Sequence, residues 1–174
     1  MRGLRIAVAV MTATAAILVG TARSEPATST ACTAAATKAT VASFMTSFNR
    51  GDYDALQAMF AREPSFQWYS ANAPGLRVRA AAHNRATLIR YFRARHAKRD
   101  RMRLVSVRFT GNSRGHGAVP DYGNFVAVLR RSTSDYRNGA WFGLISKGAI
   151  VCSAEPSVPQ FIVFSFGGPG SAGG

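Results

Sequence analysis

The chain has 174 residues, of which 47% are hydrophobic, and a formal net charge of +14 from 22 Lys and Arg against 8 Asp and Glu. This length and composition suit one domain with a single core, and the charge favours acidic partners over basic ones. The His, Cys and Asp residues form no cluster with metal-ligand spacing, so we expect neither a metal site nor a cofactor.

Residues 1–24 are typical of a secretory signal peptide. Arg2 and Arg5 precede an uncharged, mostly apolar run that ends near Gly20 and is followed by small and polar residues. The run is too short for a comfortable membrane span, so we expect cleavage rather than anchoring. The sequence therefore predicts a secreted or extracytoplasmic protein.

The only two cysteines are Cys32 and Cys152, the first of them in a lead-in of residues 25–40. Two cysteines of an exported protein should pair, and only one intramolecular pairing exists. We therefore predict a disulfide that ties the first helix to a late strand. It would stabilise the fold by about 4–5 kcal/mol on the chain-entropy model.

Two helices are predicted after the lead-in. Between Thr33 and Asn49 the apolar residues recur at intervals of three and four, which places them on one helical face. These residues are Val41, Phe44, Met45 and Phe48. Gly51 ends this helix, and Asp52 can cap a second helix that Pro64 stops.

A strand and a third helix are predicted next. Ser65–Ser70 alternates between apolar and polar sides, as a half-buried strand does, and Leu76–Arg79 is compatible with a short second strand. Asn84 or Thr87 can open the third helix, which has an inward apolar stripe and basic residues on its other faces.

The rest of the chain is predicted to be a meander of four strands: Met102–Thr110, Asn124–Ser134, Ala140–Cys152 and Gln160–Gly167. The last three strands are apolar on both sides, so the sheet needs cover on both faces. The helices can cover one face and a second subunit the other, which predicts a homodimer. Residues 168–174 are expected to form a disordered tail.

The order and spacing of these elements resemble the nuclear transport factor 2-like superfamily (the SnoaL-like or ketosteroid-isomerase-like fold) over residues 41–167. The helix joint Asn49-Arg50-Gly51-Asp52 and the pair Phe60-Ala61 carry this resemblance. The segments Trp68-Tyr69-Ser70 and Lys147-Gly148-Ala149-Ile150, followed by Cys152, are similar to small exported members of unestablished function. The resemblance implies an α+β fold in which N-terminal helices pack on a strongly curved, mostly antiparallel sheet, a cone-like α+β barrel with a deep pocket.

Ketosteroid isomerases of this superfamily use an Asp base and two hydrogen-bond donors around one carbonyl. On the resemblance, the base position falls on Trp68, the Tyr donor on Phe44, and the protonated acid close to Lys147 and Gly148. The three required groups are missing, so isomerase activity is excluded. A different, uncharacterised enzyme would need a titratable pair from another set: His83, His96, Tyr69, Tyr91, Asp121, Asp135 and Lys147.

The preferred hypothesis is a binding module that holds a small hydrophobic or amphipathic ligand in the cone pocket. The residues expected to line this pocket are Phe44, Phe48, Phe66, Trp68, Arg85, Tyr91, Lys147 and Phe164. The aromatic members could equally fill the space as an ordinary core, because periodicity does not distinguish filled from empty space.

An alternative hypothesis is an interaction module with an Arg-rich face. Eleven positive residues lie between Arg77 and Arg108 against the single acidic residue Asp100, and Arg forks suit phosphate or carboxylate. The candidate basic face consists of Arg90, Arg93, Arg95, Lys98, Arg99, Arg101 and Arg103. Its partner would be an acidic surface or anionic lipid, and nucleic acid is disfavoured because no binding motif accompanies the charge. A plain solvated helix face explains the same pattern.

Overall fold

The computed structural model describes residues 32–62, 65–71, 80–117, 119–152 and 159–167. The expected signal peptide, the strand considered at 76–79 and the expected tail at 168–174 lie outside these residues. The described elements, in chain order, are α1 Ala34–Arg50, α2 Tyr53–Ala58, β1 Gln67–Ser70, β2 Ala80–Ala82, α3 Arg85–Ala97, β3 Arg101–Ser113, β4 Tyr122–Ser132, a 3-10 turn at Arg137–Gly139, β5 Phe142–Val151 and β6 Gln160–Phe166.

The helix ends follow local capping chemistry. The Thr33 side chain accepts a hydrogen bond from the Ala36 N–H at the start of α1, and Gly51 ends this helix in the left-handed conformation with φ 72°. Asp52 caps α2 as predicted, and Asn84 is the residue that opens α3. The predicted caps at Gly51 and Asp52 are thus confirmed.

Helix α2 is shorter than a helix stopped by Pro64 would be, because strand pairing begins before that residue. The N–H of Phe161 donates to the Met59 carbonyl, and the Ala61 N–H donates to the Phe161 carbonyl. Phe60 therefore lies in a parallel bridge with Phe161 at the start of β6. Helix α2 ends at Ala58 with Met59 as its C-cap, and the chain that follows makes these bonds.

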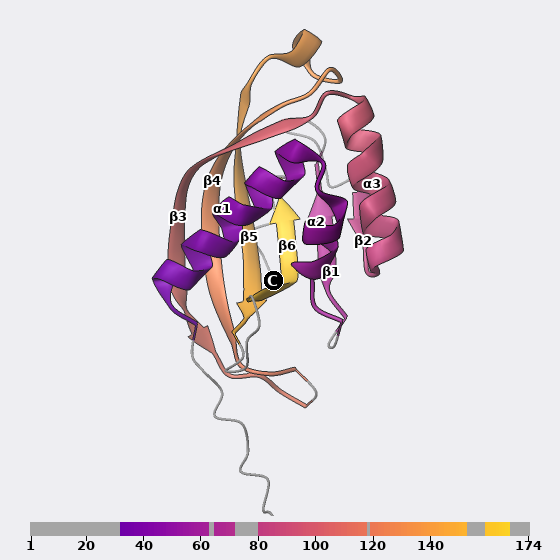
Figure 1. The fold of residues 1–174 in the computed structure, drawn as a ribbon. Helices are drawn as coiled ribbons and strands as arrows, with labels where there is room; N and C mark the ends of the chain where they lie inside the picture. Colours follow the sequence, from indigo (N-terminus) through magenta and orange to yellow (C-terminus); the bar gives the residue numbers. More distant parts are fainter. Residues whose placement is uncertain (1–31, 63–64, 72–79, 118, 153–158, 168–174) are drawn as a thin grey trace, which may run out of the picture.

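The six strands form one sheet in the order β2-β1-β6-β5-β4-β3. All neighbours are antiparallel except β1 and β6, which run parallel. Strand β3 has irregular register at Leu104/Ser106 and Phe109/Gly111, and such bulges bend a strand. Figure 1 shows the long strands β3 to β5 curving around α1, with α2 on the same side and α3 beside β2. The predicted α+β architecture and the predicted meander of β3 to β6 are confirmed, with a sheet that curls without closing.

The two faces of this sheet have different environments. Along β4, the side chains of Phe125, Ala127 and Leu129 are buried beneath the helices, whereas Val128 between them is 40% exposed. Its cross-strand partner Ile145 is 60% exposed. The inner face therefore carries the core, and the outer face is open in the single chain. The second subunit expected to cover the outer face stays a prediction.

The predicted disulfide between Cys32 and Cys152 is present, with 5.2 Å between the two Cα atoms and 120 residues between them in sequence. It joins the residues just before α1 to the end of β5. Gly123 of β4 allows this approach, because a Cβ there would lie 2.5 Å from the Cys32 Cβ.

Among the described residues, no helix has both the length and the apolar character that a membrane crossing requires.

Removal of this disulfide should destabilise the fold. The double variant Cys32→Ser/Cys152→Ser should lose about 4–5 kcal/mol of unfolding free energy, because the bridge closes a loop of most of the chain in the unfolded state. Urea denaturation followed by circular dichroism measures the change. Wild-type protein under reducing conditions should show the same loss, and a loss below about 1 kcal/mol in both would contradict the stabilising role assigned to the bridge.

Candidate functional site

The aromatic side chains expected to line a pocket lie together inside the curved sheet. Phe44 and Trp68 are fully buried, and so are the rings around them. The centroid of the Phe44 ring lies 5.0 to 6.2 Å from the ring centroids of seven neighbours: Phe48, Phe60, Trp68, Phe92, Phe161, Phe164 and Phe166. Phe66 joins this cluster through Phe60, at 4.9 Å. The rings therefore fill the space that they were expected to surround.

The polar residues expected in the same pocket do not accompany the rings into one site. Tyr91 packs against Trp68, but its hydroxyl lies 3.4 Å from the Arg131 guanidinium. Lys147 pairs with Val126 on the outer face, whereas its neighbour Gly148 faces inward, where a Cβ would lie 2.5 Å from the Phe125 ring. Strand alternation thus directs Lys147 away from the aromatic cluster, which corrects the sequence-based assignment.

The structure also brings together a titratable pair that the sequence did not reveal. The Tyr53 hydroxyl at the start of α2 lies 2.7 Å from Nδ1 of His96, in the last turn of α3. The His96 ring packs against Phe48 at 4.7 Å. Burial lowers the pKa of His96, and the Arg101 charge adds to this effect while the Asp100 charge opposes it. His96 therefore stays neutral in the folded chain at pH values at which an ordinary imidazole begins to bind a proton.

This arrangement predicts a pH dependence of stability. Between the ordinary imidazole pKa of 6.5 and the lower folded value, the unfolded chain binds a proton that the folded chain does not. The unfolding free energy should therefore fall as the pH drops below about 7, with a slope of at most about 1.4 kcal/mol per pH unit, and level off below the folded pKa. Urea denaturation across this range measures the slope.

The variant His96→Gln should flatten this dependence, because it removes the buried imidazole. The matched control His116→Gln removes an exposed imidazole and should leave the slope unchanged. Equal slopes in wild type and His96→Gln would show that His96 does not cause the pH dependence.

Arg95, expected on the basic face, is instead buried with 5% exposure. Its guanidinium donates to Asp100, Asp135 and Thr133, each at 2.7 Å. The hydrogen bond from Arg95 lowers the pKa of Asp135, and the charges of Arg95 and Lys98 act in the same direction. Arg95 therefore holds the end of α3 to the loop after β4 and does not belong to the exposed face.

Asp100 is fully buried and neutralises a second arginine, Arg131 of β4. Nη2 and Nε of Arg131 lie 2.5 and 2.9 Å from the two carboxylate oxygens, and Nη1 donates to the Ser70 hydroxyl and the Ala71 carbonyl. Desolvation lowers the pKa of Arg131, but the hydrogen bonds and charges of Asp100 and Tyr91 together outweigh it, so the pKa is raised. Asp100 thus links α3, β4 and the end of β1.

Removal of this carboxylate should be costly. The variant Asp100→Asn leaves two buried guanidinium groups without their shared counter-charge, and we expect a loss of about 3–5 kcal/mol of unfolding free energy. The control Asp54→Asn removes an exposed carboxylate from the first turn of α2 and should cost less than about 1 kcal/mol. Chemical denaturation of both variants measures the difference, and similar losses would contradict the role given to Asp100.

The other members of the predicted basic face are exposed but do not form one surface. The Arg93 guanidinium lies 4.8 Å from the ring centroid of Tyr53 on the helix side, and that of Arg103 lies 4.5 Å from the Trp141 ring on the outer face of the sheet. Lys98 lies 3.5 Å from Asp135. The remaining members are Arg90 on α3, Arg99 in the following turn and Arg101 on β3. The positive charge is thus divided between two sides of the molecule.

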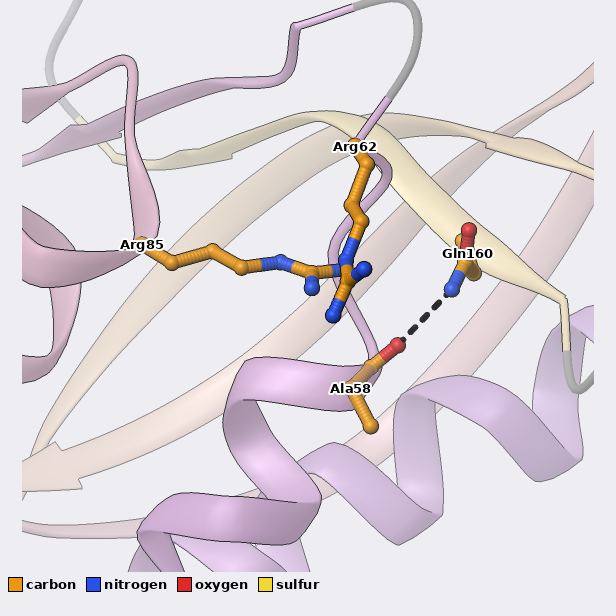
Figure 2. Close-up of a pocket in the computed structure, with 4 residues that line it drawn as sticks. All are labelled: Ala58, Arg62, Arg85 and Gln160. Atoms are coloured by element: carbon orange, nitrogen blue, oxygen red, sulfur yellow. Dashed lines mark hydrogen bonds between the residues drawn. The ribbon is translucent and has the colours of Figure 1, made fainter.

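A pocket of about 430 Å³ lies where α2, α3 and β6 meet, lined by Ala58, Arg62, Arg85 and Gln160. Figure 2 shows the Arg62 and Arg85 side chains extending toward one another. The side-chain amide of Gln160 donates a hydrogen bond to the Ala58 carbonyl at 3.0 Å. Arg85 is the first residue of α3, and Arg62 follows α2. Arg85 was expected to contact a ligand, whereas Arg62 was missed, because no spacing marked a residue of the α2–β1 connection.

The two arginines of this pocket lack a counter-charge among the described residues. The Arg85 guanidinium donates through Nη2 to the Phe60 carbonyl, while its buried Nε has no partner in the described part of the chain. Burial lowers the pKa of Arg85, and the nearby Arg62 charge lowers it further. No described carboxylate forms an ion pair with Arg62 or Arg85. This arrangement can accept an anion and offers no general base.

The chain resembles several solved structures in fold. A protein of unknown function with a cystatin-like fold from Methylobium petroleophilum PM1 has a TM-score of 0.54 at 11% identity, with 83% of this chain and 84% of that chain covered. Another from Nostoc punctiforme PCC 73102 has a TM-score of 0.52 at 14% identity, with 74% and 84% covered. A ketosteroid isomerase-like protein from Erwinia carotovora atroseptica SCRI1043 has a TM-score of 0.49 at 14% identity, with 75% and 93% covered.

No protein-family model and no curated protein matches the chain. The likeness to the cystatin-like structures and the order of helices and strands together confirm the predicted nuclear transport factor 2-like fold. At such low identity the likeness extends to the fold alone.

Proposed function

We propose that the chain is a binding module that holds the anionic group of a small molecule between Arg62 and Arg85. One observation carries the proposal: two guanidinium groups share a pocket in which no described carboxylate neutralises them. Like charges brought together repel, and the lowered pKa of Arg85 reflects both this repulsion and burial. A bound carboxylate or phosphate would relieve the repulsion and accept hydrogen bonds from both forks.

The pocket supports this proposal better than the interior of the cone does. A hydrophobic or amphipathic ligand placed among the rings would have to separate Phe44 from its neighbours, which lie in van der Waals contact. At the Arg62–Arg85 pocket no core contact has to be broken. An amphipathic ligand is therefore proposed to bind there through its charged head.

We also propose that the protein lies outside the cytoplasm. The disulfide between Cys32 and Cys152 is of a kind that persists in oxidising compartments, and the apolar run before Gly20 supports export. Catalysis is not part of the proposal, since Ala58, Arg62, Arg85 and Gln160 include no side chain suited to general acid-base chemistry at neutral pH.

The test is calorimetric titration of the folded protein with inorganic phosphate and with a short alkyl phosphate. Wild type should bind both, and Arg62→Gln should weaken binding about tenfold or more, because a hydrogen bond to a charged group is lost. Arg85→Gln should do the same, whereas Arg85→Lys should retain part of the affinity. Arg50→Gln removes an exposed charge at the end of α1 and serves as the matched control.

The proposal is contradicted if the wild-type protein binds neither probe at low ionic strength. It is contradicted equally if Arg62→Gln and Arg85→Gln bind both probes as tightly as wild type does.

A further inference from the structure

Three of the described large aliphatic side chains are strongly exposed, and they lie close together on the long strands. Val105 is 59% exposed, Val128 is 40% exposed and Ile145 is 60% exposed. Val128 of β4 pairs with Ile145 of β5 on one side and with Ser106 of β3 on the other. Val105 directly precedes Ser106, at the register irregularity of β3. We call these three residues the outer apolar patch.

Positive side chains surround this patch. Arg103 and Arg130 are cross-strand partners one step beyond Val128, and Arg108 is paired with Val126 one step before it. All three arginines are exposed. The six strands contain no Asp or Glu at all, so no strand residue offers a counter-charge to them.

An indole lies at the margin of the same face. Trp141 directly precedes β5, is half-buried and carries the Arg103 guanidinium 4.5 Å from its ring centroid. An aromatic ring with one apolar and one polar side is suited to the boundary between water and lipid. The outer face thus combines an aliphatic centre, an indole and a cationic rim.

From this combination we propose that the outer face of β3, β4 and β5 docks onto an anionic lipid surface. The cationic rim is complementary to negatively charged headgroups, and the outer apolar patch reaches the depth where acyl chains begin. A soluble acidic polymer would use the arginines but leave the aliphatic side chains in water. The exposed aliphatic residues therefore favour lipid over a polyanion.

A second copy of the chain fits this face less well. A two-fold interface brings the same patch of both subunits together, so the arginines of one copy would face those of the other. With no acidic residue in the strands, such an interface would leave Arg103, Arg108 and Arg130 without counter-charges. Charge complementarity therefore favours an anionic occupant over self-association.

Vesicle cosedimentation tests the proposal with the disulfide-bonded protein. Binding should be strong to phosphatidylcholine vesicles that contain about 30% phosphatidylglycerol and weak to pure phosphatidylcholine. The double variant Arg103→Gln/Arg130→Gln should lower the partition coefficient about tenfold or more. Val128→Thr/Ile145→Thr keeps the branched side chains that suit a strand but lowers their apolar character, and it should reduce binding about fivefold.

Two controls separate docking on this face from general attraction between opposite charges. Arg50→Gln/Arg90→Gln removes the same number of exposed charges from α1 and α3 and should bind almost as wild type does. Trp141 fluorescence should shift to shorter wavelength on binding, while Trp68 is already fully buried and should not respond. Circular dichroism melting of each variant confirms that it is folded.

Three results would overturn the proposal. The first is a wild-type protein that does not bind the anionic vesicles. The second is binding that is unchanged in Val128→Thr/Ile145→Thr and fully competed by soluble polyglutamate, which would identify a polyanion site. The third is self-association that disappears in the same variant, measured by light scattering, which would make this face an interface between copies.

Discussion

The packing of Phe44 determines where the rest of the molecule can lie. Its ring meets α1, α3, β1 and β6 at once, through Phe48, Phe92, Trp68 and Phe164. Aromatic rings at these separations leave no room for a ligand unless they move apart. The helices and the curled sheet are thereby fixed around a solid interior, and binding chemistry has to be sought on the surface and at the junctions between elements.

The few acidic residues of the chain determine which of its many arginines are neutralised inside the fold. The chain has 22 basic and 8 acidic residues, and one buried carboxylate, Asp100, is committed to two arginines inside the fold. Asp135 serves Arg95 and Lys98 at the edge of this network. The acidic residues that pair in the described structure therefore stabilise the junction of α3 with the sheet. The arginines of the α2–α3 pocket and the outer face form no ion pair with a described carboxylate.

The features that could be predicted from the sequence depend on local chemistry or on the periodic spacing of apolar residues. The helix caps at Gly51 and Asp52, the strand alternation and the disulfide are of this kind. Whether the cone was open could not be predicted, because a buried stripe looks the same beside a cavity or another ring. Arg95 lies on a helix rich in exposed arginines, so its burial could not be predicted from the sequence. It is buried because the turn after α3 brings Asp100 within hydrogen-bond distance of its guanidinium. Arg62 carried no signal, since its proximity to Arg85 arises from tertiary packing.

The two proposed surfaces have a spatial relation that bears on function. The outer face is the side of β3 to β5 that points away from α1, whereas the Arg62–Arg85 pocket lies at the junction of α2, α3 and the start of β6 (Figures 1 and 2). A chain docked on lipid through its outer face would keep this pocket on the helix side, away from the bilayer. A ligand would then reach the pocket from the aqueous phase, so docking would localise the protein without supplying the ligand. The two activities would therefore be separable by substitution, because they share no residue.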